Sequence, residues 1–516
     1  MQRFIARFGS LVSGVLSGFD RLVFRGYLPP LLWKFGIQTF LSKVRVRGAE
    51  FKQYALRTSE RVKLAALAEA QEQGRPIRYL PSSSDSKEDL ARAVLAERPI
   101  EQGLICAFSV VEPCLSFEFC RSSDAPERSL QLRPRKCLHI YQYRIHPRFG
   151  FMNVRLQSWF PFAVQICING REWLGRRLVA ERMAHQRYDN CFPWVADVAR
   201  AQQFLDDQLT TNWHQVLDEV LRLVNPLHEE IFATWPMEYY WTAYQTEWAT
   251  DVMFSDAAAL ASLYPVLARH ALLHFQSPDL MRFLGRKLHG NFAGALGADY
   301  KHRAEGLRVK HWANGNSLKM YNKANGLLRI ETTLGNPSDF LVLRPRNNEP
   351  DGKLAWRPIR KSVADLYRRA QISQRANERY LDALAAVDDS TPLATVFDQV
   401  AQPTTWRDRR VRALRIGDPA DVALLAAISR GEFVTAGFRN RDIRALLHPQ
   451  VTDDPTTPRR LAARVGRQLR LLRAHGLIHK VPKTHRYRLT TKGQTLTAAL
   501  TAARSATLRQ LLREAA

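Results

Sequence analysis

Alternation of apolar and polar residues predicts β-strands in three parts of the chain. The clearest pattern lies on either side of the turn signal Ala324-Asn325-Gly326, where residues 316–323 and 327–332 alternate in character. An aromatic, alternating stretch runs over residues 136–170, and residues 239–254 form a further extended segment. We therefore expect a mixed or antiparallel β-sheet as the core of the protein.

A β-α-β pattern precedes these segments. Ile77–Leu80 and Leu104–Val111 are short apolar runs typical of strands, and Lys87–Glu97 between them has a helical pattern. Ser86 and Asp89 have the spacing of a capping box at the start of that helix. The unit lacks the glycine-rich loop of a phosphate site.

Helical periodicity dominates the end of the chain. Helices are predicted at 418–429, 440–447 and 457–475, followed by a short hairpin over 476–489. Three helices and a basic hairpin in this order are typical of a winged helix. The inner face of the third helix is formed by Leu461, Val465, Leu469 and Leu472.

These patterns predict an α+β protein with a C-terminal winged helix. A chain of 516 residues is long enough for about three or four domains. The expected regions are a mainly helical region (1–100), a β-rich region (101–235), a second β-rich region that carries the central hairpin (236–345), a helical connector (346–414) and the winged helix (415–500).

The two β-rich regions contain similar short motifs. Residues 138–143, followed by Val154-Arg155-Leu156-Gln157, are similar to residues 318–323 followed by Leu328-Arg329-Ile330-Glu331. One hypothesis is a degenerate internal duplication, in which Gln157 replaces the carboxylate of Glu331. Chance similarity between two aromatic hairpins is the alternative.

The net charge of the chain indicates what kind of molecule it binds. The net charge is +27, and residues 455–516 contain fourteen Lys and Arg residues against one acidic residue, which gives this segment +13. No segment is long and apolar enough to predict a membrane span, and the first residues do not form a convincing signal peptide. The partner that we expect is therefore nucleic acid, above all double-stranded DNA.

The six cysteines form no CxxC pair, so their spacing indicates neither a zinc site nor a disulfide framework. We expect reduced thiols in a cytoplasmic protein.

Regularly spaced arginines on the third C-terminal helix suit a DNA major groove, and a basic hairpin suits phosphates or the minor groove. The expected DNA-binding residues are Arg459, Arg460, Arg464, Arg467, Arg470 and Arg473 on the helix, with Lys483 and Arg486 at the tip of the hairpin.

The central hairpin has two candidate registers. A two-residue loop at Asn325-Gly326 scatters its polar residues over both faces of the sheet. A three-residue loop with Gly326 in the left-handed conformation gathers them on one face, and we expect this register. That face contains Lys319, Tyr321, Lys323, Arg329 and Glu331, whereas Leu318, Met320, Leu328 and Ile330 remain for the core.

A tyrosine hydroxyl among cations and a carboxylate suits transesterification of a phosphodiester. Tyr321 is the candidate nucleophile, and Lys319, Lys323 and Arg329 are placed to neutralise developing charge. Glu247 and Asp251 share one face of the 239–254 strand and with Glu331 form a candidate site for Mg²⁺ or Mn²⁺. The alternatives are an exposed sheet face with a Lys319–Glu331 pair, and Asp251 as a helix cap.

The segments that carry these candidate residues are Glu247-Trp-Ala-Thr-Asp251-Val, Leu318-Lys-Met-Tyr321-Asn-Lys323 and Leu328-Arg-Ile-Glu331. Together they resemble the core of rolling-circle replication initiators of small plasmids, the Rep_trans-like group. The resemblance implies that Tyr321 attacks DNA and becomes linked to a 5′-phosphate, that a 3′-hydroxyl is released, and that Asp251 and Glu331 help to hold a divalent metal. It covers about a fifth of the chain and makes residues 236–345 the nicking core.

Several features depart from that family. The chain is longer at its N-terminal side, lacks the His-hydrophobic-His motif of the other large initiator class, and ends in a segment that resembles MarR-type winged helices. These departures favour a transposase or strand-transfer enzyme of a mobile element. No GxxxxGK[ST] motif predicts ATP-driven unwinding. The alternative function is a non-enzymatic winged-helix transcriptional regulator or nucleic-acid-binding protein, and a homodimer is compatible with either.

Overall fold

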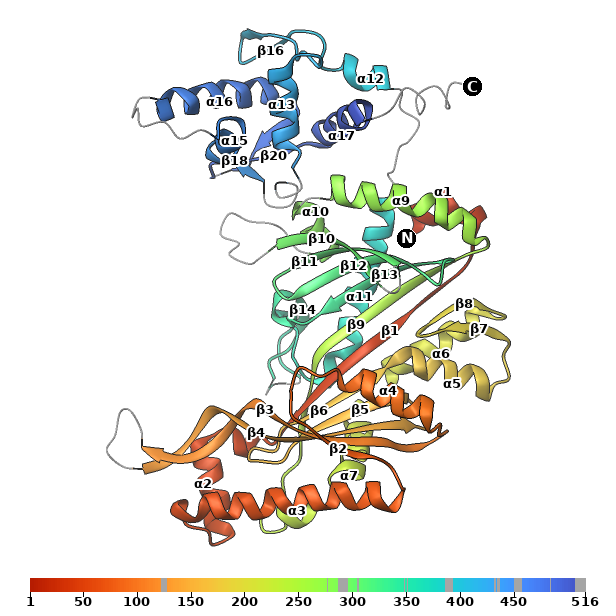
Figure 1. The fold of residues 1–516 in the computed structure, drawn as a ribbon, viewed down its shortest axis with the longest axis vertical. Coiled ribbons are helices and arrows are strands. Elements are labelled where there is room, and N and C mark those ends of the chain that lie inside the picture. The colour runs from red at the N-terminus through yellow and green to blue at the C-terminus, as the bar shows by residue number, and fades with distance from the viewer. Residues whose placement is uncertain are drawn as a thin grey trace. The chain divides into compact units, whose positions relative to one another are not determined.

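The computed structural model describes residues 1–121, 128–275, 277–285, 296–303, 306–347, 349, 351–385, 393–430, 433, 437–449, 457–482 and 484–505. Eleven strands form one large sheet in the order β10-β11-β12-β13-β9-β1-β6-β5-β4-β3-β2 (Figure 1). β2 runs parallel to β3, whereas β4 runs antiparallel to both β3 and β5. The predicted class, α+β with a mixed sheet, is confirmed at this level.

The chain forms two compact units, which we describe separately. Unit 1 contains residues Met1–Ser13, Phe254–Ile330 and Arg375–Ala516, and unit 2 contains Gly14–Met253 and Glu331–Gln374. Each unit therefore combines segments from several of the regions expected from the sequence.

Unit 2 contains the larger part of the sheet. Its strands are β1 (Val12–Tyr27), β2 (Ile77–Leu80), β3 (Gly103–Arg121), β4 (Arg128–His146), β5 (Gly150–Gln157), β6 (Val164–Asn169), β7 (His185–Tyr188), β8 (Cys191–Val195), β9 (Tyr240–Phe254), the end of β13 (Leu327–Leu334), β14 (Leu341–Arg344) and β15 (Ala355–Pro358). Its helices are α2 (Lys34–Lys43), α3 (Phe51–Glu72), α4 (Lys87–Glu97), α5 (Gly170–Ala180), α6 (Val198–Thr210), α7 (Trp213–Val224), α8 (His228–Ile231) and the start of α11 (Leu366–Leu384).

β1 is the element that the sequence pattern concealed. The expectation of a mainly helical N-terminal region describes α1 (Gln2–Phe8) to α4, but residues 12–27 are a sixteen-residue strand. Most of its side chains are buried on both faces, so the period-two alternation of a half-exposed strand is missing. A Cβ atom at Gly18 would lie 2.8 Å from Leu205 of α6, which shows how closely that helix approaches the strand.

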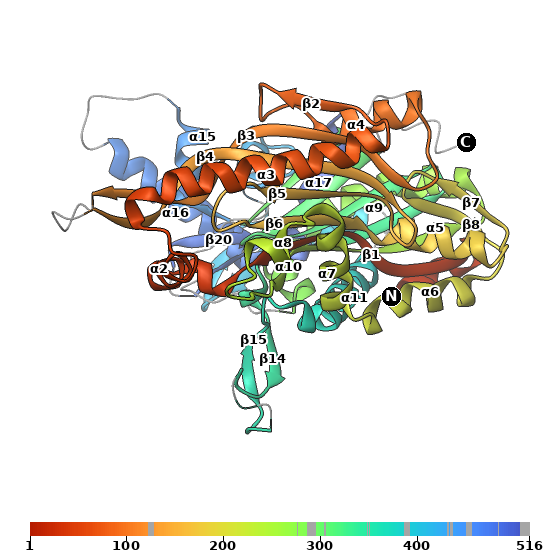
Figure 2. The ribbon, with the colours of Figure 1, turned by 90° about the horizontal axis from the view of Figure 1, so that it is seen from below.

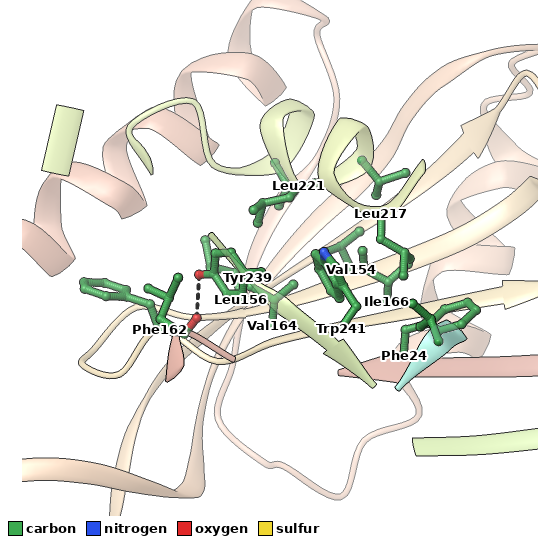
Figure 3. Packing of buried hydrophobic residues seen from close by; sticks show 14 of the residues in the cluster. Phe24, Val154, Leu156, Phe162, Val164, Ile166, Leu217, Leu221, Tyr239 and Trp241 are labelled. Carbon is green, nitrogen blue, oxygen red and sulfur yellow. Dashed lines mark hydrogen bonds between the residues drawn. The ribbon is translucent and has the colours of Figure 1, made fainter. Parts of the chain in front are cut away.

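Helix α7 covers β5 and β6 in the main core of unit 2. Figure 3 shows its Leu217 and Leu221 above apolar residues of the two strands. The Tyr239 hydroxyl lies inside this core and donates a hydrogen bond to the Phe162 carbonyl at 2.8 Å. A buried phenol needs such a partner, because an unsatisfied hydroxyl in an apolar core costs free energy. The strand residues drawn there are Val154, Leu156, Val164 and Ile166.

The predicted β-α-β unit is confirmed at the edge of the sheet. β2 and β3 pair in parallel, and α4 lies between them in the chain. The Ser86 side chain caps α4 by accepting a hydrogen bond from the Asp89 N–H at 3.3 Å. Helix α3 packs on β3, and β14 and β15 form a separate two-stranded hairpin (Figure 2).

Unit 1 contains the other edge of the sheet and the C-terminal helices. Its elements include α9 (Ala257–His274), α10 (Ser277–Phe283), β10 (Leu296–Arg303), β11 (Gly306–Ala313), β12 (Asn316–Lys323), the start of β13 (Leu327–Leu334), α12 (Leu393–Asp398), β16 (Thr404–Trp406) and β17 (Arg409–Val411). They continue with α13 (Pro419–Ile428), β18 (Phe438–Arg439), α15 (Asn440–Leu447), α16 (Thr457–Ala474), β19 (Ile478–Lys480), β20 (Arg486–Leu489) and α17 (Thr491–Ser505). The three C-terminal helices and the hairpin predicted from the sequence are all present. In the parts of the chain that the structure describes, no helix is long and apolar enough to cross a membrane.

Three residues, 324–326, lie between β12 and β13 as expected, but the left-handed conformation is not at Gly326. Ala324 and Asn325 have positive φ values of 52° and 56°, whereas Gly326 does not adopt the left-handed conformation. Two successive left-handed residues define a type I′ turn, whose twist matches that of the flanking strands. The four predicted core residues are buried, and every residue of β13 is buried as well, so the alternative of an exposed face does not hold for that strand.

Replacing Ala324 by glycine should raise the free energy of unfolding by about 0.5–1 kcal/mol. The left-handed conformation costs an L-residue about 1–2 kcal/mol, and the larger entropy of glycine in the unfolded chain offsets part of that gain. Urea denaturation of the two proteins measures the difference. Ala324→Val is the matched opposite change and should be destabilising, and a loss of stability in Ala324→Gly would contradict the left-handed geometry.

Candidate metal-binding site

Three carboxylates converge in unit 2. Asp20 on β1, Glu247 on β9 and Glu331 on β13 each offer an oxygen, and these atoms all lie within 4.8 Å of one another. Asp20 and Glu331 are only 4% and 2% exposed, and Glu247 is half-buried. Carboxylates held this close repel one another, and a divalent cation is the charge that such an all-oxygen set binds best.

The sheet explains the convergence. β13, β9 and β1 are consecutive strands, and neighbouring strands lie about 4.8 Å apart. Residues at the same level on three such strands therefore meet on one face. Glu247 and Glu331 are more than 80 positions apart in the sequence, and Asp20 is still farther from both. No local sequence motif therefore indicates this group.

Two asparagine side chains hold the Asp20 carboxylate in place. Asn190, in the turn between β7 and β8, donates from Nδ2 to both oxygens at 2.8 and 2.9 Å. Asn169 donates from Nδ2 to Oδ1 at 3.1 Å, while its own Oδ1 accepts the Arg171 N–H at 2.7 Å and caps α5. Such outer partners fix the orientation of a metal ligand.

Gly170 lets α5 begin directly on β1. A Cβ atom at this position would lie 2.3 Å from the Phe19 carbonyl oxygen, so only glycine fits. The next residue, Arg171, donates to the Ala249 carbonyl at 2.9 Å and forms an ion pair with Asp251 at 3.1 Å. The side chains of Arg171 and Asp251 are 0% and 2% exposed, so this ion pair is fully buried.

Asp251, which the sequence analysis assigned to the metal, is not part of the carboxylate group. Glu247 and Asp251 do share a face of β9, but four residues of extended strand separate them by roughly 13 Å. That distance is too long for two carboxylates to hold one ion, and Arg171 neutralises Asp251 instead. Glu247 and Glu331, the other two predicted ligands, lie together with Asp20.

Asp20 is the residue that the sequence analysis missed. It lies in the middle of β1. The available signal was a single carboxylate inside a segment of apolar residues and glycines, because such a residue is rarely buried without a specific partner.

The predicted nucleophile and its cations belong to unit 1. Tyr321 is half-buried on β12 and lies opposite Arg308 of β11, and Lys319 lies opposite Lys310. Lys323 and Arg329 are both buried. Lys319 and Tyr321 share a face of β12 because strand side chains alternate.

Most of the arginines of α16 that the sequence analysis selected are exposed. Val465, Leu469 and Leu472 are buried in the core of the C-terminal region, whereas Arg473 is half-buried with its guanidinium 5.0 Å from the Trp406 ring. Arg486 is half-buried in β20 and donates to the Gly437 carbonyl at 3.4 Å. Lys483 lies outside the described residues. The exposed arginines are Arg459, Arg460, Arg464, Arg467 and Arg470.

Comparison of the chain with models of protein families, with curated proteins and with solved structures gives no match.

Proposed function

We propose that the protein is a DNA-binding enzyme of a mobile or plasmid-like element that cleaves DNA with the help of a divalent metal ion. The convergence of Asp20, Glu247 and Glu331 carries this proposal. Octahedral Mg²⁺ has metal–oxygen distances of about 2.1 Å, which place its ligand oxygens about 3–4.2 Å apart. Small rotations of the three side chains would bring their oxygens from within 4.8 Å to that spacing.

A bound Mg²⁺ or Mn²⁺ would polarise a phosphoryl oxygen and offset the charge that develops on it. The residues of this chain would hold the metal ion and orient its ligands. Asp20, Glu247 and Glu331 supply the oxygens, and Asn169 and Asn190 keep the Asp20 carboxylate in one rotamer.

Tyr321 is the proposed nucleophile, on the strength of the resemblance to rolling-circle initiators. Its hydroxyl oxygen would form a bond to phosphorus while the bond from phosphorus to the 3′ oxygen breaks. The phenolic proton passes to water and the 3′ oxygen gains a proton, which leaves a 5′-phosphotyrosyl linkage and a free 3′-hydroxyl. Lys319, Lys323 and Arg329 are the proposed cations for this reaction.

We infer that residues 415–500 form a MarR-like winged-helix domain. The support is the order α13, β18, α15, α16, β19 and β20, together with a small sheet in the order β18-β20-β19. The five exposed arginines of α16 would lie toward DNA as those of a recognition helix.

Loss of two of these arginines, Arg467→Ala and Arg470→Ala, should weaken DNA binding and lower its salt dependence. Each lost phosphate contact reduces the slope of log K against log salt by about 1. Fluorescence anisotropy over a range of salt concentrations measures both quantities. Arg57→Ala on α3 removes an exposed arginine outside α16 and should leave both quantities unchanged. Equal slopes for all variants would show that α16 does not bind DNA.

A non-enzymatic winged-helix regulator is the second candidate. The exposed arginines of α16 support it as well, whereas it has no use for three converging carboxylates.

Incubation of the full chain with supercoiled plasmid and with single-stranded DNA in Mn²⁺ tests the enzyme. We expect relaxed plasmid and a covalent protein–DNA adduct that disappears in Tyr321→Phe. Tyr300→Phe, a change at a tyrosine of β10 that is 48% exposed, is the matched control and should keep the adduct. Metal-dependent cleavage that persists in Tyr321→Phe would assign the nucleophile elsewhere, and intact plasmid with the wild type would favour the regulator.

We also infer a degenerate duplication of the sheet, and strand order supports it. From the neighbouring strands β1 and β9, the order is β1-β6-β5-β4-β3 on one side and β9-β13-β12-β11-β10 on the other. In each half, the strand that comes first in the chain (β1 or β9) lies at the centre of the sheet, and the strand that comes last (β6 or β13) pairs with it. This strand order makes β5 and β6 equivalent to β12 and β13, whereas the sequence motifs made β4 and β5 equivalent to them.

A further inference from the structure

A second group of metal-ligating side chains lies on β3 and β4 of unit 2. The sulfur atoms of Cys114 and Cys137 and a ring nitrogen of His139 all lie within 4.8 Å of one another. Cys114 pairs with Arg135 and Cys137 pairs with Glu112, so the two cysteines are diagonal neighbours on adjacent strands. Cys137 and His139 share a face because they are two residues apart.

We propose that Cys114, Cys137 and His139 bind a Zn²⁺ ion and leave its fourth position open. Two thiolates and one imidazole form a ligand set that Zn²⁺ prefers over Mg²⁺ or Ca²⁺. Zinc–sulfur distances of about 2.3 Å and zinc–nitrogen distances of about 2.0 Å place tetrahedral ligand atoms roughly 3.5–3.8 Å apart. The observed limit of 4.8 Å lies within a small side-chain rotation of that arrangement.

The His139 ring is prepared for metal binding. Its Nδ1 lies 3.1 Å from the Cys137 carbonyl oxygen, so Nδ1–H donates there and the lone pair is on Nε2. A backbone carbonyl on the second nitrogen is the usual way in which proteins orient a histidine ligand.

The side chains of Cys114 and Cys137 are hydrogen-bonded to each other. Gln157 is buried beside this group, with its Nε2 atom 3.7 Å from the Cys114 sulfur. Gln157 lies opposite His139 on β5.

The sequence spacing concealed this group. Cys114 and Cys137 are not in a CxxC loop, and a long antiparallel ribbon brings them together. The expectation of no zinc site was based only on cysteines close together in the sequence, and strand pairing can bring distant cysteines together as well. The two sites also differ in chemistry, because the carboxylate group offers only oxygen ligands whereas this group offers sulfur and nitrogen.

Cobalt titration of the full reduced chain without air tests the proposal. Co²⁺ replaces Zn²⁺ in tetrahedral sites, and thiolate ligands give it a charge-transfer absorption that carboxylates do not. We expect one equivalent of Co²⁺ to produce this absorption and one equivalent of Zn²⁺ to remove it. Asp20→Asn should leave the absorption unchanged, which separates this site from the carboxylate site.

Cys114→Ser, Cys137→Ser and His139→Gln should each weaken cobalt binding at least about 100-fold, because loss of even an outer partner costs about 10–100-fold. Cys120→Ser, on the same ribbon and outside the group, is the matched control and should bind as the wild type does. Far-ultraviolet circular dichroism without metal shows whether each variant is folded. No charge-transfer band, an unchanged band in folded His139→Gln and Cys114→Ser, or a Cys114–Cys137 disulfide in protein prepared under reducing conditions would each overturn the proposal.

Discussion

Asp20→Asn is expected to lower the rate of metal-dependent DNA cleavage by about 10²–10³-fold. A divalent ion contributes several kcal/mol to the stabilisation of transition-state charge, and each 1.36 kcal/mol corresponds to a factor of ten in rate. The change keeps the shape of the side chain but removes one negative charge from a group of three. It also replaces one of two acceptor oxygens with a donor that faces the amide of Asn190.

Cleavage rates at increasing Mn²⁺ concentration measure this effect. The fold should persist, since loss of one of three like charges relieves repulsion, and high Mn²⁺ should restore part of the rate. Glu229→Gln is the matched control, because Glu229 is 82% exposed and lies outside the group. A rate that equals that of the wild type at every metal concentration would remove Asp20 from the site.

Arg171→Met is expected to reduce the free energy of unfolding by about 3–5 kcal/mol. Arg171 and Asp251 form an ion pair in which both side chains are almost completely buried, and loss of one partner leaves the other charge in a low-dielectric interior. The same guanidinium donates to the Ala249 carbonyl of β9, so α5 also loses this connection to the strand. Urea unfolding followed by tryptophan fluorescence measures the loss.

The double variant Arg171→Met/Asp251→Leu distinguishes the buried charge from simple loss of packing. Replacement of both partners by apolar residues removes the isolated carboxylate, so we expect recovery of about 2 kcal/mol or more of the loss. Additive destabilisation in the double variant would show that the ion pair is not the source of the effect. Arg177→Met, at an arginine of α5 whose side chain is 45% exposed, should change stability by less than about 1 kcal/mol.

Elements with a local pattern were predictable from the sequence. β9, β12 and β13 alternate in character, and α4 carries its cap at Ser86. Helices α15 and α16 have clear apolar faces. In each case residues close in the sequence determine the element, so one chain segment contains the whole signal.

β1 and the two ligand groups depended on contacts between distant segments. β1 is buried on both faces and closely covered by α6 at Gly18, so its pattern resembles that of a buried helix. Asp20 is brought to Glu247 by strand pairing, and Cys114 is brought to Cys137 in the same way. Asp251 shares a face of β9 with Glu247 but is not in the carboxylate group, because two residues on the same face of a strand need not be close along it.

A titration of Mn²⁺ followed by electron paramagnetic resonance tests the central claim most directly, because it needs no knowledge of the DNA sequence that is cleaved. Wild-type protein should remove about one Mn²⁺ per chain from the free-ion signal. Asp20→Asn, Glu247→Gln and Glu331→Gln should each weaken this binding by about tenfold or more, while Glu229→Gln binds as the wild type does. Equal Mn²⁺ binding by the wild type and all three carboxylate variants would contradict the assignment of Asp20, Glu247 and Glu331 as a metal site.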